Sequence, residues 1–193
     1  MTVALAIPGR MTLAEFLAWD APAGVRWQLV DGVPQAMAPA SPTHARLQNE
    51  LGSLLRNHLH DRRSPCVVVA NAGVIAPNRD RPNYRIPDLA VTCTEEAPGD
   101  PAIHDPVLIV EILSPGNRAD TWANVRAYQE MPGVREILVL HSDAVAADLL
   151  RRGEDGGWPE MPVRIAGGDL SLASIGFTAP LTALYRTTRL ARD

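Results

Sequence analysis

The run Val107–Leu113 restricts the fold more than any other segment, because every residue in it except Glu111 is aliphatic. Side chains alternate between the two faces of a β-strand, so this segment carries aliphatic side chains on both faces. A strand of that kind belongs in the middle of a sheet that is covered on both sides. The run therefore predicts a buried central strand in an α/β fold with a mixed sheet.

Local signals predict further helices and strands around this run. A capping box at Thr12 predicts a short helix, and Asp31-Gly32 between two apolar segments predicts a tight hairpin. Ser41 caps a longer helix that is expected to end near His60. Strands are expected at 66–70, 73–76, 88–94, 107–113, 136–141 and 145–152, a helix at 120–130, and a last helical turn at 181–185. The resulting order is helix, strands, helix, strand.

Length and charge restrict the class of protein. The chain has 193 residues, which suits one domain over 1–193. Its formal net charge of -4 argues against a protein that coats nucleic acid through a broad positive surface, but it is compatible with a local basic cleft. The 18 Lys and Arg residues are all arginine. A lysine is therefore unavailable as a catalytic base.

Apolar runs and cysteines indicate the compartment. No run of about eighteen apolar residues is present, so we expect no membrane span and a cytoplasmic protein. Cys66 and Cys93 lie at the ends of apolar runs. We expect them to be two buried free thiols, as is usual in a reducing cytosol.

Glu111 is the most informative polar residue. On a strand it shares one face with Ile109 and Leu113, so its carboxylate lies among aliphatic neighbours. Burying an ionised carboxylate there costs several kcal/mol unless another group pairs with it. An arginine partner is the plain structural alternative. A metal-binding or catalytic role is the interpretation that this setting favours.

Asp88 is the candidate second carboxylate. Pro87 forces Ile86 towards an extended conformation and leaves Asp88 as the first residue of a strand. A turn residue is the alternative interpretation. The chain from Asp88 to Glu111 is long enough for one strand, a loop and a neighbouring strand, so the two carboxylates can converge on one cation through oxygen ligands. Mg²⁺ in such a site polarises a phosphoryl oxygen and activates water, as phosphodiester hydrolysis requires.

Five segments of this sequence resemble one family when they are taken in order. They are 27–32, 36–38 with His44 behind it, 86–91, 110–115 and 120–128. This set is similar to the Uma-two family of restriction-endonuclease relatives within the PD-(D/E)XK nuclease superfamily, over roughly residues 11 to 186. The resemblance implies a restriction-endonuclease-like core with the order α-β-β-β-α-β, here with an extra N-terminal helix and hairpin.

The resemblance also implies roles for individual residues. Asp88 and Glu111 match the metal-binding acidic residues, and the backbone carbonyl of Ile112 is a further oxygen ligand. The superfamily pattern has lysine where this chain has Leu113. The family commonly has it on the following helix, where this chain has Asn124. Gln28 stands where the first strand usually has an acidic residue.

Other candidate residues carry weaker signals. His44 faces inward with Leu47 and Leu51, which fits a structural histidine, and the resemblance adds a site-lining role. The segment with Arg79, Arg81, Tyr84 and Arg85 is expected to be a loop, either solvated or in contact with phosphates and bases.

The sequence is compatible with two alternative functions. One is a Mg²⁺-dependent endonuclease in which Asp88 and Glu111 hold the metal, with Asn124, Gln28 and His44 as further polar site residues. The other is a nuclease fold that has lost catalysis and serves as a nucleic-acid-binding or protein-interaction module. The expected partner is nucleic acid, DNA in first place, with a protein as the other possible partner of the second function, and a homodimer is expected for the nuclease.

Overall fold

The computed structural model describes residues 9–77 and 81–191. Its helices are α1 (Leu13–Ala18), α2 (Pro42–Asp61), α3 (Arg118–Gln129) and α4 (Leu181–Tyr185), with 3-10 turns at Ala173–Ile175 and Arg189–Ala191. Its strands are β1 (Trp27–Val30), β2 (Val33–Ala36), β3 (Val67–Ala70), β4 (Val74–Ala76), β5 (Asn83–Arg85), β6 (Leu89–Thr92), β7 (Pro106–Leu113), β8 (Glu136–His141), β9 (Ala147–Arg151), β10 (Val163–Ile165), β11 (Asp169–Leu172) and β12 (Phe177–Pro180).

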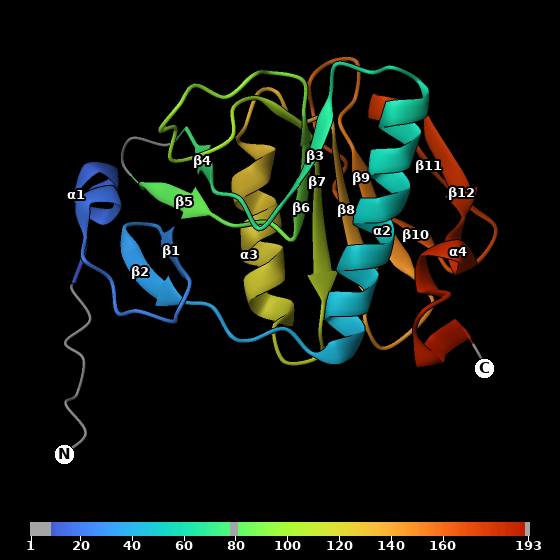
Figure 1. The fold of residues 1–193 in the computed structure, drawn as a ribbon, viewed down its shortest axis with the longest axis horizontal. Coiled ribbons are helices and arrows are strands. Elements are labelled where there is room, and N and C mark those ends of the chain that lie inside the picture. The colour runs from blue at the N-terminus through green and yellow to red at the C-terminus, as the bar shows by residue number, and fades with distance from the viewer. Residues whose placement is uncertain (1–8, 78–80, 192–193) are drawn as a thin grey trace.

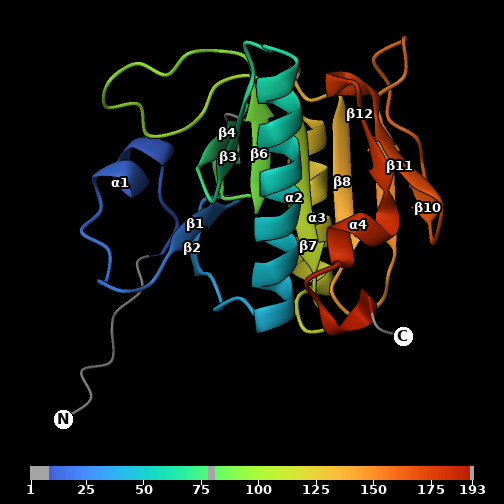
Figure 2. The same ribbon diagram turned by 45° about the vertical axis from the view of Figure 1, so that its right-hand side comes forward.

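The predicted central strand is β7. It lies inside a six-stranded sheet with the order β10-β9-β8-β7-β6-β3, in which β7 and β8 are parallel and the other pairs are antiparallel. Helix α2 covers one face of this sheet and α3 covers the other (Figures 1 and 2). The mixed sheet with two covered faces is confirmed.

Alternation along β7 divides the core into two clusters. Leu108, Val110 and Ile112 pack on the side of α2, together with α4 and the β11–β12 hairpin. Ile109 and Leu113 pack on the side of α3. The aliphatic pattern of a single strand thus explains why helices are needed on both faces of the sheet.

The α-β-β-β-α-β core is present as α2, β3, β6, β7, α3 and β8. Strands β4 and β5 leave this order and join the β1–β2 hairpin in a second sheet, β2-β1-β5-β4. The hairpin turns where predicted, because Asp31 and Gly32 have φ angles of 49° and 81°. This left-handed conformation is the one that two-residue hairpin turns require.

The segment that we expected to be a loop contains a strand instead. Tyr84 and Arg85 belong to β5, which pairs with both β1 and β4. Arg79 lies outside the described residues. A strand of three residues is too short for its periodicity to be recognised, and its pairing partners are distant in the chain. Arg85 is only 3% exposed, so the expectation of a solvated or phosphate-contacting side chain is wrong for it.

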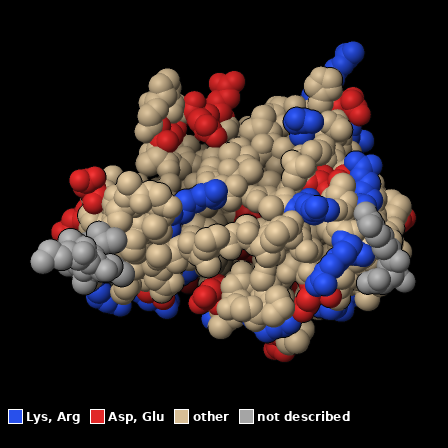
Figure 3. Space-filling model, turned by 60° about the horizontal axis from the view of Figure 1, so that its bottom comes forward, with Lys and Arg blue, Asp and Glu red and all other residues tan. Residues whose placement is uncertain are grey.

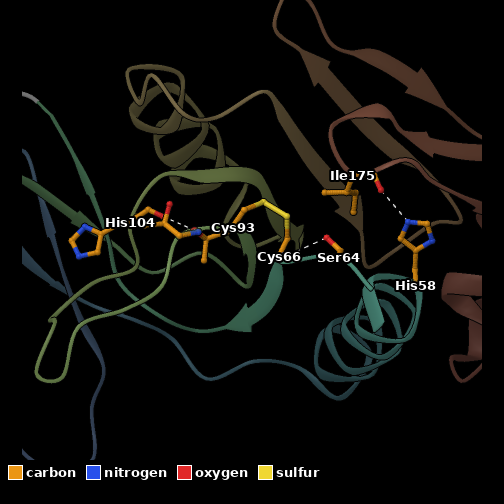
Figure 4. The surroundings of a disulfide bond; sticks show 8 residues. His58, Ser64, Cys66, Cys93, His104 and Ile175 are labelled. Carbon is orange, nitrogen blue, oxygen red and sulfur yellow. Dashed lines mark hydrogen bonds between the residues drawn. A yellow bond between two sulfur atoms is a disulfide. The ribbon is translucent and has the colours of Figure 1, made fainter. Parts of the chain in front are cut away.

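The expectation of two buried free thiols is also wrong. Cys66 and Cys93 form a disulfide, Cys66 is half-buried and Cys93 is exposed (Figure 4). Strands β3 and β6 are antiparallel with Val67 opposite Thr92, so the next step outward brings the two cysteines face to face. The pairing of β3 with β6 is a tertiary fact that the apolar runs do not reveal.

Among the described residues, no helix is both long enough and apolar enough to cross a membrane.

Opening the disulfide should destabilise the fold. The cysteines are 27 residues apart, and closing a loop of that length stabilises the folded state by about 3.5 kcal/mol in the chain-entropy model. We therefore expect dithiothreitol to lower the free energy of unfolding, measured by urea denaturation, by roughly that amount. The double variant Cys66→Ser/Cys93→Ser should show the same loss and no response to reductant. Equal stability of the oxidised and reduced wild type would contradict the expectation.

Candidate functional site

Strand register brings the two predicted carboxylates together. β6 and β7 are antiparallel with Leu89 opposite Val110, so one step further along places Asp88 opposite Glu111. Residues directly opposite one another on antiparallel strands have Cβ atoms about 5 Å apart and project on the same face. The acidic pair therefore sits at the end of β6, with Glu111 on the face of the sheet that α3 covers and Asp88 in contact with α2.

Asp88 is held by hydrogen bonds on three sides. Its Oδ2 accepts a bond from the Ile112 amide at 2.7 Å, and its Oδ1 lies 2.7 Å from His44 Nε2. Its main-chain oxygen accepts a bond from Gln48 Nε2 at 2.7 Å. His44 and Gln48 lie one turn apart in α2, so this helix positions Asp88 from the opposite side to β7. The inward-facing His44 that periodicity predicted thus contacts a predicted site residue.

The main-chain carbonyl of Ile112 points to the side of β7 on which Asp88 lies. In an antiparallel ladder the N–H and C=O of one residue point to the same side of the strand. The Ile112 N–H points towards Asp88, beyond the end of β6. The Ile112 oxygen is therefore directed to that side as well, near the pair that it was expected to assist.

Glu111 receives two hydrogen bonds on one oxygen. Its Oε1 accepts a bond from the Tyr128 hydroxyl at 2.7 Å and one from Asn124 Nδ2 at 3.2 Å. Both donors are on α3, four residues apart on one face of the helix. Oε2 has no hydrogen-bond partner among the described residues. One oxygen of this carboxylate is fixed, and the other is left for a ligand.

The buried guanidinium of Arg85 is linked to Glu111 through the side-chain amide of Asn124. Arg85 Nη1 donates to Asn124 Oδ1 at 2.7 Å, and Arg85 Nε donates to Asn83 Oδ1 at 3.0 Å. No direct ion pair between Arg85 and Glu111 forms within the part of the chain that the structure describes. Asn124 thus accepts from the guanidinium and donates to the carboxylate. The alternative of a plain arginine partner holds only in this indirect form.

Gln28 lies beside Arg85, one step removed from the carboxylates. Leu29 pairs with Tyr84, which places Gln28 opposite Arg85 on the other face of the small sheet. Gln28 is 7% exposed, and its buried Oε1 has no hydrogen-bond partner in residues 9–77 and 81–191. Buried polar atoms are normally paired, so this oxygen is a feature that the fold alone does not explain.

The environment raises the pKa of the Glu111 carboxyl to about 8. Burial is the largest cause, because it penalises the charged form, and the Asp88 carboxylate adds repulsion. The hydrogen bonds from Tyr128 and Asn124 and the charge of Arg85 act in the opposite direction. Two facing carboxylates with one raised pKa are what an acidic pair without a cation should show.

The donor set fits a hard cation with few protein ligands. No group of three or more His, Cys, Asp or Glu side chains within the described ranges is arranged to hold a metal ion. Mg²⁺ does not require one, since it keeps several waters and binds proteins through one or two carboxylates. Asp88, Glu111 and the Ile112 carbonyl present oxygen atoms of the type that it prefers.

Two residues of this site were missed by the sequence analysis. Tyr128 was not named as a site residue; it is fully buried, and its hydroxyl donates a hydrogen bond to Glu111. Its spacing of four from Asn124 was the available signal. Arg85 was considered only as part of a loop, because its contact with α3 depends on how the small sheet docks. Leu113, at the position of the superfamily lysine, is 1% exposed and packs in the core.

Comparisons with known proteins identify a family and a structural relative of this chain. The family model Uma2, described as "Putative restriction endonuclease", matches residues 13–182. A crystal structure of a "putative nuclease belonging to DUF820" from Anabaena variabilis matches with a TM-score of 0.73 and 16% identity, over 91% of this chain and 98% of that chain. At this identity the likeness establishes a shared fold. A search of curated proteins found no match.

The raised pKa of Glu111 predicts how stability depends on pH in metal-free buffer. Between its ordinary value of 4.5 and about 8, the folded protein keeps a proton that the unfolded chain has lost. This group's contribution to the free energy of unfolding is therefore complete below about pH 4.5. It falls by up to about 1.4 kcal/mol per pH unit above that, and levels off past pH 8.

The variant Glu111→Gln isolates this contribution, because an amide does not titrate there and its oxygen still accepts the bonds from Tyr128 and Asn124. Urea denaturation of both proteins from pH 5 to pH 8 should show the variant gaining on the wild type as pH rises. A difference between the two that does not change with pH would show that Glu111 titrates normally.

Proposed function

Since the chain belongs to the Uma2 family, described as "Putative restriction endonuclease", we propose that it is a metal-dependent endonuclease that hydrolyses phosphodiester bonds of nucleic acid. Asp88 and Glu111 are the metal-binding carboxylates of this proposal, and Mg²⁺ is the proposed metal. DNA is the proposed first substrate, because restriction enzymes act on DNA.

The observation that carries the proposal is the register of β6 against β7. It sets two carboxylates opposite one another at the end of β6, where Glu111 is 6% and Asp88 9% exposed. Facing buried carboxylates repel, and a structural role gives no reason to keep both. A divalent cation between them removes the repulsion and compensates the burial of both charges.

Each residue of the site has a distinct task in this proposal. Asp88 and Glu111 bind the cation with oxygen atoms, and the Ile112 carbonyl adds a third. A bound Mg²⁺ supplies Lewis acidity at a phosphoryl oxygen and makes water more acidic. His44 and the Ile112 amide fix the orientation of Asp88, while Tyr128 and Asn124 fix that of Glu111.

The remaining polar groups supply charge and hydrogen bonds rather than a base. Arg85 brings a positive charge next to the acidic pair, but an arginine stays protonated and cannot accept a proton. Asn124 links the two groups, because its amide accepts a hydrogen bond from Arg85 and donates one to Glu111. Gln28 Oε1 is free to accept a bond from a water or from Arg85 when substrate is bound.

A second candidate function rests on the missing lysine. Leu113 is a core residue at the position of the superfamily lysine, and the chain has no lysine elsewhere. A nuclease fold in this condition can bind nucleic acid or a protein without cutting. The two candidates differ in one measurable property, which is metal-dependent cleavage.

Removing either carboxylate should abolish cleavage. We expect Asp88→Asn and Glu111→Gln to lose more than the roughly 10- to 100-fold that substitutions next to metal ligands typically cost. Tyr128→Phe, which removes a hydrogen bond to Glu111, should fall within that lower range. The measurement is the rate of cleavage of supercoiled plasmid, single-stranded DNA and RNA with Mg²⁺ and with EDTA.

The matched control is Glu96→Gln, which removes an exposed carboxylate from the loop before β7 and should cut as fast as the wild type. Cleavage at the same rate by the wild type and both acidic-pair variants would identify a contaminant. Binding without metal-dependent cleavage would favour the second candidate function.

Metal binding should also raise the thermal stability of the protein. A ligand that binds only the folded state raises the apparent stability in proportion to the logarithm of its concentration. We expect Mg²⁺ to raise the melting temperature of the wild type at pH 7 and to leave Asp88→Asn nearly unchanged. Ca²⁺ offers the same readout without hydrolysis. A wild type and an Asp88→Asn variant that respond alike would argue against a cation at this pair.

The cytoplasmic location and the homodimer stay predictions. The Cys66–Cys93 disulfide weighs against a strongly reducing compartment, where such bonds are rare. Alkylation of intact cells before lysis, followed by mass spectrometry, measures the oxidation state of the two cysteines directly.

A further inference from the structure

A groove of about 350 Å³ lies between α2 and β3, the edge strand of the six-stranded sheet. Strand β3 is the last strand on this side of the sheet, and α2 packs beside it. Its polar lining residues are Gln48, Asn49, Ser53, Arg56 and Asn71. None of these residues belongs to the acidic pair or to the side chains that hold it, except Gln48.

Gly52 keeps the middle of this groove open. A glycine inside a helix is less favourable than alanine by roughly 1 kcal/mol. The packing of Gly52 does not require it, since a Cβ there would meet Leu89 Cδ2 at 3.4 Å, an ordinary van der Waals contact. The missing side chain instead leaves space above Leu89 and Ala70, which line the groove.

The groove begins beside the main chain of Asp88, one member of the acidic pair. The main-chain oxygen of Asp88 accepts hydrogen bonds from Gln48 Nε2 at 2.7 Å and from the Asn71 amide at 3.2 Å, and both residues line the groove. From Gln48 to Arg56 the helix rises about 12 Å. That distance corresponds to roughly three stacked nucleotides of one strand.

The lining groups suit an anionic polymer with polar edges. No acidic residue is among the described residues that line the groove, and Arg56 places a cation at the end far from Asp88. The side chains of Asn49, Ser53 and Asn71 make no hydrogen bond to other described residues. Arginine, amide and hydroxyl groups are those that contact phosphates, sugars and base edges.

Charge and shape favour one unpaired strand over a duplex. The face of the molecule at the start of α2 shows arginines interspersed with acidic side chains rather than an unbroken basic surface (Figure 3). In the groove, amides stand on both walls, Asn49 on the helix and Asn71 at the end of β3. They can reach the base edges of an unpaired strand, and those edges are occupied by pairing in a duplex.

We propose that this groove binds a single-stranded segment of the nucleic-acid substrate, leading away from the acidic pair, with Arg56 on a backbone phosphate. The proposal rests on the proposed function for its choice of ligand. A peptide strand added to the free edge of β3 is the rival occupant. The absence of acidic lining and the continuity with Asp88 favour nucleic acid.

The test measures binding without cleavage. The protein is titrated in EDTA into three fluorescein-labelled probes: a single-stranded DNA of about ten nucleotides, the matching RNA and the matching duplex. Fluorescence polarisation is followed at several salt concentrations. We expect single strands to bind more tightly than the duplex. Gly52→Leu, which fills the groove, should weaken single-strand binding at least about tenfold, while Gly52→Ala should change it little.

Arg56→Ala should weaken single-strand binding by several fold and reduce the slope of log affinity against log salt by about 0.7, the value for one phosphate contact on a single strand. Its matched control is Arg126→Ala, an exposed arginine on α3 at the opposite face of the sheet, which should leave the affinity unchanged. Circular dichroism melts check that each variant folds.

Every outcome separates this proposal from the nuclease proposal. If Gly52→Leu and Arg56→Ala bind single strands like the wild type, or if the wild type prefers duplex, the groove proposal is overturned even where Asp88 and Glu111 prove essential for cleavage. If groove variants lose binding but the wild type cuts nothing, the groove proposal stands and the nuclease proposal fails. If neither single strand binds, the groove proposal is also overturned, and a peptide strand at the edge of β3 becomes the favoured occupant.

Discussion

The burial of Glu111 in the central strand is the constraint on which the rest of the site depends. A carboxylate at that depth is tolerated only when other groups compensate it. Helix α3 supplies the hydroxyl of Tyr128 and the amide of Asn124, and the small sheet supplies the charge of Arg85. One helix and two sheets must dock correctly for this one side chain to be satisfied.

Asp88 is held by a different set of elements, and this division has a physical meaning. It receives bonds from α2 and from the main chain of β7, whereas Glu111 receives its bonds from α3. The two carboxylates are therefore fixed from opposite faces of the sheet while they face one another at the end of β6. Such an arrangement fixes the orientation of two carboxylates, which the proposed cation site requires of its ligands.

The missing lysine is only partly compensated. A lysine near an acidic pair supplies both a positive charge and, once deprotonated, a base. Arg85 supplies the charge through Asn124, but its guanidinium does not give up a proton at ordinary pH. In the proposed nuclease, the nucleophile would therefore have to be a water activated by the bound metal. Because the lysine is missing, the residue types of this site do not by themselves distinguish a nuclease from a binding protein with the same fold.

The sequence by itself determined the elements whose signals are local. The period of β7, the caps of α1 and α2 and the Asp31-Gly32 turn rest on neighbours in the chain, and each is found where it was expected. Tertiary structure decided the rest. The strand β5, the Cys66–Cys93 disulfide and the contact of Arg85 with Asn124 arise from pairing between distant segments, about which hydrophobic periodicity carries no information. Glu111 was recognisable from the cost of burying it, but only the register of β6 decided that Asp88 stands opposite.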